Sequence, residues 1–208
     1  MIIDPNTFER FSAVLTGVIV PRPIAFVSTM APDGVVNLAP YSFFNAVSYT
    51  HVVFSSSRNV GNKSKDTLRN IEETGQFVVN IVVDSIADAM NATAAEYPEG
   101  VDEFEIAGLT HAPSQIVKPP RVAESPVNIE CELEQVVQIG SGSHEHGLVI
   151  GKILLMHVRD DVIDGHRIDQ AKLMATGRMA GNMYCRTNDR FEMVRPVYDP
   201  ETNAIVTR

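Results

Sequence analysis

The chain has 208 residues, of which 44% are hydrophobic and 21% are charged, which is typical of a globular protein and excludes a disordered one. Its 17 Lys and Arg residues against 26 Asp and Glu give a net charge of −9, which disfavours nucleic acid and anionic membranes as partners. The length suits a single domain over residues 1–208. No apolar run approaches a membrane span, and the N-terminal residues lack the cations of a signal peptide, so we expect a cytoplasmic protein.

The first part of the chain predicts strands joined by tight turns. A β-branched and aromatic run at 24–29 predicts a strand, and the Pro-Asp-Gly sequence at 32–34 predicts a turn. Residues 35–39 then predict the returning strand of a hairpin, and 52–56 a third short strand.

Helices are expected in the middle of the chain. Residues 66–73 predict a helix that ends at Gly75, and 85–95 predict a second helix. Between them, the apolar run 77–83 predicts a buried central strand. A shorter helical segment is expected over 99–105.

Two long strands complete the predicted sheet. Residues 127–134 alternate apolar and polar side chains, which indicates a strand with one buried face. Residues 148–158 predict another strand, with a bulge at Gly151. Short strands, tight turns and two inserted helices favour a mainly β fold in which an antiparallel sheet closes as a barrel. The Gly-x-Gly-x-x-Gly sequence of a doubly wound dinucleotide-binding fold is absent.

A basic island stands out in this acidic chain. Within twelve residues there are four cations, where the composition predicts about one: Arg58, Lys63, Lys65 and Arg69. Hydroxyls and a glycine accompany them: Ser55, Ser56, Ser57, Thr67 and Gly61. Cations, hydroxyls and flexible backbone at the end of a strand are what a bound phosphate needs, so we predict a phosphate site for a small cofactor. The alternative is a solvated basic loop.

The segment 37–45 is unusual for a loop because it carries three aromatic residues among small and polar ones. Pro40 restricts Ala39 to an extended conformation, and the remaining N–H groups with the Ser42 hydroxyl suit the polar edge of a planar ring. Nearby aromatic side chains would wall that ring. The alternative is that these aromatic residues belong to the core at the end of a strand.

Five stretches carry a resemblance to a known family: 21–29, 37–44, 65–71, 77–80 and 177–184. In this order they resemble the flavin-reductase-like family, the FMN-binding split-barrel oxidoreductases. The resemblance implies an antiparallel six-stranded split β-barrel and a homodimer with FMN near the subunit interface.

The resemblance also implies a set of site residues. Residues around the isoalloxazine ring would be Asn37, Ala39, Pro40, Tyr41 and Ser42, largely through backbone groups. Residues around the phosphate would be Ser56, Ser57, Arg58, Lys65 and Thr67. Residues that close the pocket, from the same or the other subunit, would be Met179, Gly181 and Tyr184.

The implied activity is NAD(P)H-dependent flavin reduction. Nicotinamide would stack on the flavin and pass hydride from its C4 to flavin N5, and the reduced flavin would pass electrons to an acceptor that the sequence does not name. Because the cofactor does this chemistry, we expect no catalytic acid or base. Alternatives are a related oxidase resembling pyridoxamine-phosphate oxidases, or a flavin- or haem-binding module without turnover. His144 and His146 lack a third ligand, so no metal site is expected.

Overall fold

The computed structural model describes residues 1–58, 65–98 and 100–206. Its centre is one antiparallel sheet of seven strands in the order β2-β1-β5-β8-β9-β4-β3. These strands are β1 Ala25–Met30, β2 Val36–Tyr41, β3 Phe44–Ala46, β4 His51–Ser57, β5 Gln76–Ile81, β8 Val127–Ile139 and β9 His146–Val158. The mainly β, antiparallel prediction is confirmed. The count of six strands is wrong, because the short β3 pairs with β4 as a seventh.

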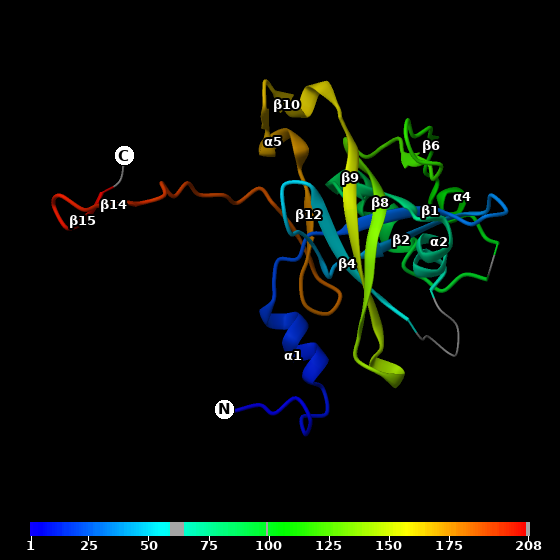
Figure 1. The fold of residues 1–208 in the computed structure, drawn as a ribbon, viewed down its shortest axis with the longest axis horizontal. Helices are drawn as coiled ribbons and strands as arrows, with labels where there is room; N and C mark the ends of the chain where they lie inside the picture. Colours follow the sequence, from blue (N-terminus) through cyan, green and yellow to red (C-terminus); the bar gives the residue numbers. More distant parts are fainter. Residues whose placement is uncertain (59–64, 99, 207–208) are drawn as a thin grey trace.

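The sheet curls until its two edges meet. β2 and β3 are the edge strands, yet only Ser42 and Phe43 separate them in the chain. Near this seam the Tyr41 ring lies 5.0 Å from the Phe54 ring of β4, which in turn lies 5.7 Å from the Phe77 ring of β5. A short turn and packed rings thus bring the edges together, where a closed barrel would have a continuous hydrogen-bonded ladder. Figure 1 shows the long β8–β9 ribbon crossing the direction of β1 and β2.

The helices are short. They are α1 Phe11–Val18, α2 Asp66–Thr74, α3 Ala87–Ala92, α4 Glu103–Ala107 and α5 Gln170–Leu173, with single 3-10 turns at Asp84–Ile86, Gly142–His144 and Asp160–Val162. α2 matches its prediction and ends at Gly75, which takes a left-handed conformation with φ of 70° and donates its N–H to the Ile71 carbonyl at 2.9 Å. Leu68 and Ile71 of α2 are fully buried against the sheet, and that burial holds the helix in place.

The packing of the core inside the curled sheet explains why residue 151 is a glycine. A Cβ built on Gly151 would lie 2.2 Å from Cζ of Phe77, whose side chain is fully buried. Gly151 therefore leaves room for that ring. Gly151 itself pairs with Leu133, and the extra residues lie on either side of this pair: Glu134 on β8, between Leu133 and Gln135, and Leu154 on β9, between Ile153 and Leu155.

Smaller strand pairs surround the main sheet. They are β6 His111–Ala112 with β7 Arg121–Val122, β10 Ile163–Asp164 with β11 Arg167–Ile168, β12 Thr176–Arg178 with β13 Tyr184–Arg186, and β14 Val197–Asp199 with β15 Ala204–Val206. β6 and β7 lie in the segment between α4 and β8, which also carries Pro113, Pro119, Pro120 and Pro126.

Two segments project from the body. Figure 1 shows α1 at one end of the chain and an extended C-terminal arm carrying β14 and β15 at the other. α1, which the sequence analysis did not predict, has no buried residue, and large apolar side chains on the arm are exposed, among them Phe191 at 84% and Met193 at 79%. In the described part of the chain, every helix falls short of the length and apolarity needed to cross a membrane.

Candidate functional site

A cleft with two lobes follows the edge of β2. The first lobe has a volume of about 340 Å3 and is lined by Asn37, Ala39, Pro40, Tyr41, Lys65, Asp66, Thr67, Arg69, Thr93, Ala94, Ala95, Glu96, Tyr97, Pro98 and Glu103. The second lobe has a volume of about 370 Å3 and is lined by Ile24, Pro40, Ser42, Met90, Asn91, Ala94, Arg178, Asn182 and Tyr184. Pro40 and Ala94 border both lobes, so the two lobes are neighbours.

The cleft brings together most of the residues that the sequence nominated. In the first lobe these are Asn37, Ala39, Pro40, Tyr41, Lys65 and Thr67, and in the second they are Pro40, Ser42 and Tyr184. The two nominated groups, one for a ring and one for a phosphate, therefore meet in the first lobe although they come from separate parts of the chain.

The geometry of β2 accounts for Pro40 at the border. The Leu38 N–H donates to a carboxylate oxygen of Glu103 at 2.9 Å, so it points away from β1. Backbone groups two residues apart in a strand point the same way, which places the Pro40 nitrogen on the open edge. A proline there leaves no ladder bond unmade and presents an apolar ring between the lobes.

A buried polar network ties β2 to α2. Asn37 Nδ2 donates to Thr67 Oγ1 at 2.7 Å and to Thr29 Oγ1 at 3.4 Å. Asn70 Nδ2 also donates to Thr29 Oγ1, at 3.1 Å. All four side chains are buried, so the network fixes the edge strand against the helix.

The N-terminus of α2 opens into the first lobe. Asp66 and Thr67, the first two residues of this nine-residue helix, line the lobe, and Lys65 is its N-cap. Among the described residues, no side chain caps the N-terminus of α2. Uncapped N–H groups and the helix dipole favour a bound anion, and the side chains of Lys65 and Arg69 lie beside them.

The described cations of the basic island face carboxylates. Lys65 Nζ lies 3.9 Å from Glu96, and Arg69 forms an ion pair of 2.9 Å with Asp66. The first lobe is therefore lined by three acidic residues, Asp66, Glu96 and Glu103, as well as by the cations Lys65 and Arg69. Lys63 and Gly61, which the sequence analysis included in the island, lie outside the described residues.

Arg58 lies away from the lining of both lobes. Its guanidinium contacts Glu72 and, through Nε at 3.4 Å, Glu145. Ser57 is also outside the lining, and Ser56 is buried behind Tyr41. The sequence could not show this pairing, because both carboxylates come from other elements of the fold.

Burial raises the pKa of two ionisable groups of the first lobe, Tyr41 and Glu103. Burial raises the pKa of the Tyr41 phenol, although the neighbouring Thr67 and Ser56 hydroxyls lower it in part. Burial likewise raises the pKa of Glu103, and the hydrogen bond from Leu38 N–H opposes that rise. Glu103 was not predicted as a site residue, because in the sequence it is one of several acids in a short helical segment.

The second lobe is shaped by the β12–β13 hairpin. The Arg178 guanidinium lies over the Tyr184 ring, 4.5 Å from its centroid, and donates to the Gly181 carbonyl. The Tyr184 hydroxyl donates to Asn91 Oδ1 of α3 at 3.0 Å. Gly181, with φ of 56°, and Met179, whose N–H donates to the Met183 carbonyl, form the turn of this hairpin; neither lines a lobe.

Arg22 is a further residue that the sequence analysis did not nominate. It is 6% exposed and donates to the carbonyls of Thr16, Ile19 and Met179 and to Ser42 Oγ at 3.3 Å. It thus joins α1, the seam of the sheet and the β12–β13 turn. Its position between two prolines in one of the resembling stretches was the available signal.

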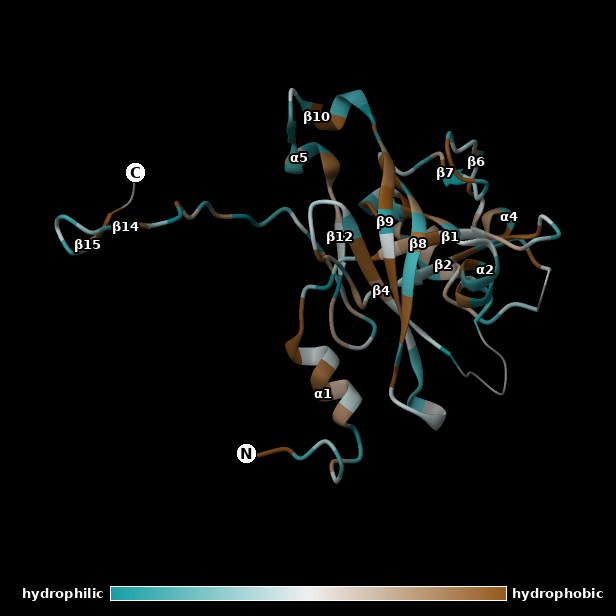
Figure 2. Ribbon diagram, in the orientation of Figure 1, coloured by the Kyte–Doolittle hydropathy of each residue, from teal (hydrophilic) through white to brown (hydrophobic). Residues whose placement is uncertain are grey.

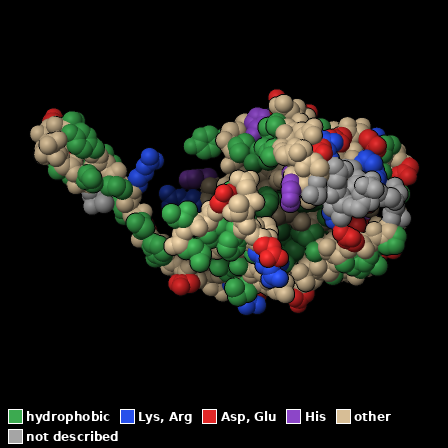
Figure 3. All heavy atoms as spheres, turned by 90° about the horizontal axis from the view of Figure 1, so that it is seen from below, with side chains coloured by type: hydrophobic (Ala, Val, Ile, Leu, Met, Phe, Trp, Pro, Cys, Tyr) green, Lys and Arg blue, Asp and Glu red, His purple; other side chains and the backbone are tan. Residues whose placement is uncertain are grey.

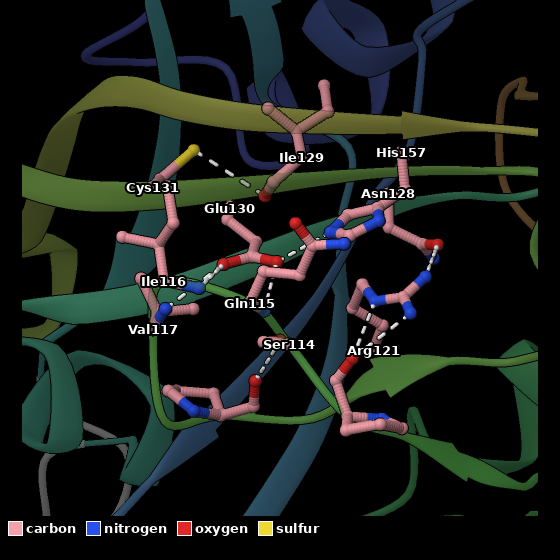
Figure 4. A network of polar contacts seen from close by, with 12 residues as sticks. Ser114, Gln115, Ile116, Val117, Arg121, Asn128, Ile129, Glu130, Cys131 and His157 are labelled. Carbon is pink, nitrogen blue, oxygen red and sulfur yellow. Dashed lines mark hydrogen bonds and ion pairs between the residues drawn. The ribbon is translucent and has the colours of Figure 1, made fainter.

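A second buried carboxylate, Glu130, lies outside the lining of both lobes. Figure 4 shows the polar contacts around it. Glu130 is fully buried in β8, accepts backbone hydrogen bonds from Gln115, Ile116 and Val117, and contacts His157 Nε2 at 2.6 Å. Burial acts to raise its pKa, but these hydrogen bonds outweigh it and hold the pKa of Glu130 at about 2. The group fastens the loop before β7 to the sheet. Within the described ranges, no three His, Cys, Asp or Glu side chains gather to hold a metal ion.

The curled antiparallel sheet with its open seam defines the chain as a split barrel. A split barrel domain from Shewanella frigidimarina has this fold, with a TM-score of 0.82 at 20% identity over 94% of this chain and 99% of that one. Residues 18–195 match the family model described as flavin reductase like domain, and the chain belongs to this family.

Relatives of higher identity span nearly the whole chain. Nitrilotriacetate monooxygenase component B from Bacillus cereus is 37% identical with a TM-score of 0.88, over 93% of this chain and 98% of that one. The 2-nitrobenzoate 2-nitroreductase of Pseudomonas fluorescens is 32% identical with a TM-score of 0.84, over 96% and 98%. An uncharacterised protein of Halalkalibacterium halodurans is 37% identical over 94% of this chain and 97% of its own length.

Proposed function

We propose that this chain is an NAD(P)H-dependent flavin reductase that binds FMN in the first lobe. The observation that carries the proposal is the meeting of two separately nominated groups in one cavity: Asn37, Ala39, Pro40 and Tyr41, and Lys65 with Thr67. Each lobe has a volume in the range of about 300–1,000 Å3 that is usual for small-molecule sites. The relatives support the proposal, since one is named as a monooxygenase component and another as a nitroreductase.

The donor set of the first lobe fits a phosphorylated flavin. The FMN phosphate would take the N–H groups at the start of α2, with Lys65 and the Thr67 hydroxyl beside it. To reach that phosphate, Lys65 need only leave Glu96, and an exposed ion pair of 3.9 Å is worth little. Arg58 would have to leave two carboxylates, so it contributes less than the sequence alone suggested.

Bound flavin would supply the two-electron chemistry, accepting hydride from a dihydronicotinamide and releasing electrons to an acceptor. The chain's own part is to hold and shield the ring. Glu103 fixes the β2 edge through Leu38 N–H, and the Asn37–Thr67 hydrogen bond fixes that edge against α2. The Pro40 ring supplies an apolar surface where the lobes meet. Because none of these roles moves a proton, we propose no catalytic acid or base.

We also propose that the active form is a homodimer. α1 has no buried residue, and the C-terminal arm exposes Phe191, Met193 and Ile205, so the single chain leaves apolar surface uncovered. Figure 2 shows hydrophobic segments in both projections, and Figure 3 shows hydrophobic side chains on the arm and on the body, on either side of a hollow. A second copy would cover this surface. Sedimentation velocity should give a dimer at micromolar concentration, and a monomer would contradict this proposal.

Steady-state oxidation of NADH and of NADPH, with added FMN or FAD, tests the enzymatic proposal. A flavin reductase oxidises the nicotinamide only when flavin is present. Binding of flavin without turnover would favour the binding module, and turnover that needs oxygen but no nicotinamide would favour the related oxidase.

A further inference from the structure

The second lobe contains a cation that differs from those of the first. Lys65 and Arg69 each face a carboxylate, whereas Arg178 has no acidic partner among the described residues. Its guanidinium makes one side-chain hydrogen bond, to the Gly181 carbonyl, out of the five N–H donors that an arginine carries. The remaining donors are available to a ligand in the lobe that Arg178 lines.

The surroundings of Arg178 are suited to an anionic group on a planar molecule. Among the residues that the structure describes, no Asp or Glu lines the second lobe, which offers hydroxyl and amide groups from Ser42, Asn91 and Asn182. Ile24 and Met90, which are 5% and 1% exposed, form an apolar wall. An uncompensated guanidinium in such a cavity binds carboxylate or phosphate oxygens in bidentate geometry.

Arg178 is also held in place before any ligand arrives. Its guanidinium stacks on Tyr184, and Tyr184 is tethered in turn to Asn91 of α3. The backbone of Arg178 exchanges hydrogen bonds of 2.9 and 2.8 Å with Arg22, next to the seam of the sheet. A side chain positioned in this way loses little conformational entropy on binding.

We propose that the second lobe binds the anionic reaction partner of the flavin, and that Arg178 binds a carboxylate or phosphate group of that partner. This inference rests on the proposed function, because it places FMN in the first lobe. Since Pro40 and Ala94 border both lobes, a planar partner held by Arg178 lies next to the ring along β2. The anionic group could belong to a nicotinamide dinucleotide or to an aromatic carboxylate that accepts electrons.

Binding of probes to flavin-free protein tests the lobe without turnover. Calorimetric titrations with pyrophosphate and with benzoate compare the wild type, Arg178→Gln, Arg178→Lys and the matched control Arg186→Gln. Lys65→Ala is titrated alongside them, so that pyrophosphate bound at the phosphate site proposed in the first lobe is recognised and subtracted. Arg186 lies on the same hairpin, is bound to Asp84 at 2.7 Å and lines neither lobe. We expect the wild type and Arg186→Gln to bind at least one probe, Arg178→Gln to bind it about tenfold more weakly or worse, and Arg178→Lys to fall between. Equal binding by Arg178→Gln and wild type, or no binding by the wild type, overturns the proposal.

Kinetics with FMN then separates the two sources of the anion. If the anion is the donor's phosphate, Arg178→Gln raises KM for NADH about tenfold with kcat little changed. If it is an acceptor's carboxylate, KM for NADH stays the same and competitive inhibition by benzoate is lost. If Arg178→Gln changes neither the KM for NADH nor the inhibition by benzoate, the proposal is overturned. Failure of the proposed function looks different, because the wild type would then not bind FMN even though the probes still bind.

Discussion

The side-chain amide of Asn37 donates a hydrogen bond of 2.7 Å to the hydroxyl of Thr67, thirty positions further along the chain. This bond joins the edge strand β2 to the first turn of α2. Both side chains are buried, so the bond is protected from competing water. The strand proposed to hold the flavin ring and the helix end proposed to hold its phosphate are therefore fixed relative to each other.

Lys65→Ala should weaken FMN binding about tenfold, near the lower end of what a charged hydrogen bond contributes, because the side chain is 38% exposed and partly screened. Fluorescence titration of FMN measures the effect. Lys152→Ala is the matched control, since Lys152 pairs with Glu132 at 2.9 Å on the β8–β9 ribbon and lines neither lobe. Equal affinities for the two variants would remove Lys65 from the site.

Glu103→Gln should be at least as stable as the wild type at pH 7. Burial raises the folded-state pKa of Glu103, so this residue stabilises the fold while protonated, fully below its ordinary pKa of 4.5, and loses that contribution as the pH rises through the raised value. Glutamine keeps an acceptor for Leu38 N–H and carries no charge. Thermal unfolding should therefore show that the melting temperature of Glu103→Gln, relative to that of the wild type, is higher at pH 7 than at pH 4.

Glu103→Ala is the control for the hydrogen bond. It removes the acceptor as well as the charge, so it should be less stable than Glu103→Gln at both pH values. If Glu103→Gln instead becomes less stable relative to the wild type as the pH rises toward 7, the ionised carboxylate stabilises the fold and the prediction is wrong.

Glu130 should stabilise the fold at neutral pH and lose this contribution in acid, which is the reverse of the pH dependence expected for Glu103. Its folded pKa of about 2 lies below the ordinary 4.5, so its contribution is present above pH 4.5 and is lost as the pH falls toward 2. The difference corresponds to about 3 kcal/mol at neutral pH, at 1.36 kcal/mol per unit. Urea unfolding of Glu130→Gln should show a loss of this order at pH 7 that shrinks near pH 3. A loss independent of pH would contradict the assignment.

Gly151→Ala should destabilise the protein by roughly 1–3 kcal/mol, the usual cost of an overpacked core. The new methyl group would lie 2.2 Å from Cζ of the fully buried Phe77. Gly17→Ala is the control, because its nearest neighbour would be 3.9 Å away and alanine favours the helix that contains it. Urea unfolding that ranks the two variants equally would refute the packing explanation.

Local patterns in the sequence predicted much of this fold. Alternation along 127–134, the apolar run 77–83 and the glycine after residue 74 each identified an element, because burial of one face and a left-handed helix end leave direct marks on neighbouring residues. α1 escaped prediction because it buries none of its residues in this chain. β8 continues past its predicted end to Ile139 because it pairs with β9 along its whole length. The sequence did not indicate this continuation, because neither face of the strand is fully buried there.

The candidate site was predicted in part for the same reason. The sequence could nominate residues that line the cleft where they are grouped along the chain: Asn37, Ala39, Pro40, Tyr41, Ser42, Lys65 and Thr67. The partners of Arg58 were not predicted, since Glu72 and Glu145 reach it only through the fold. Nor was the lack of an acidic partner for Arg178 among the described residues, which depends on which acids the fold places away from the second lobe.

The visible absorption spectrum of the purified protein with FMN, before and after anaerobic addition of NADH, tests the central claim most directly. We expect bound flavin bands that are perturbed relative to free FMN and that bleach when NADH is added. Bands identical to those of free FMN, or bound bands that persist in the presence of both NADH and NADPH, would contradict a flavin reductase built on this cleft.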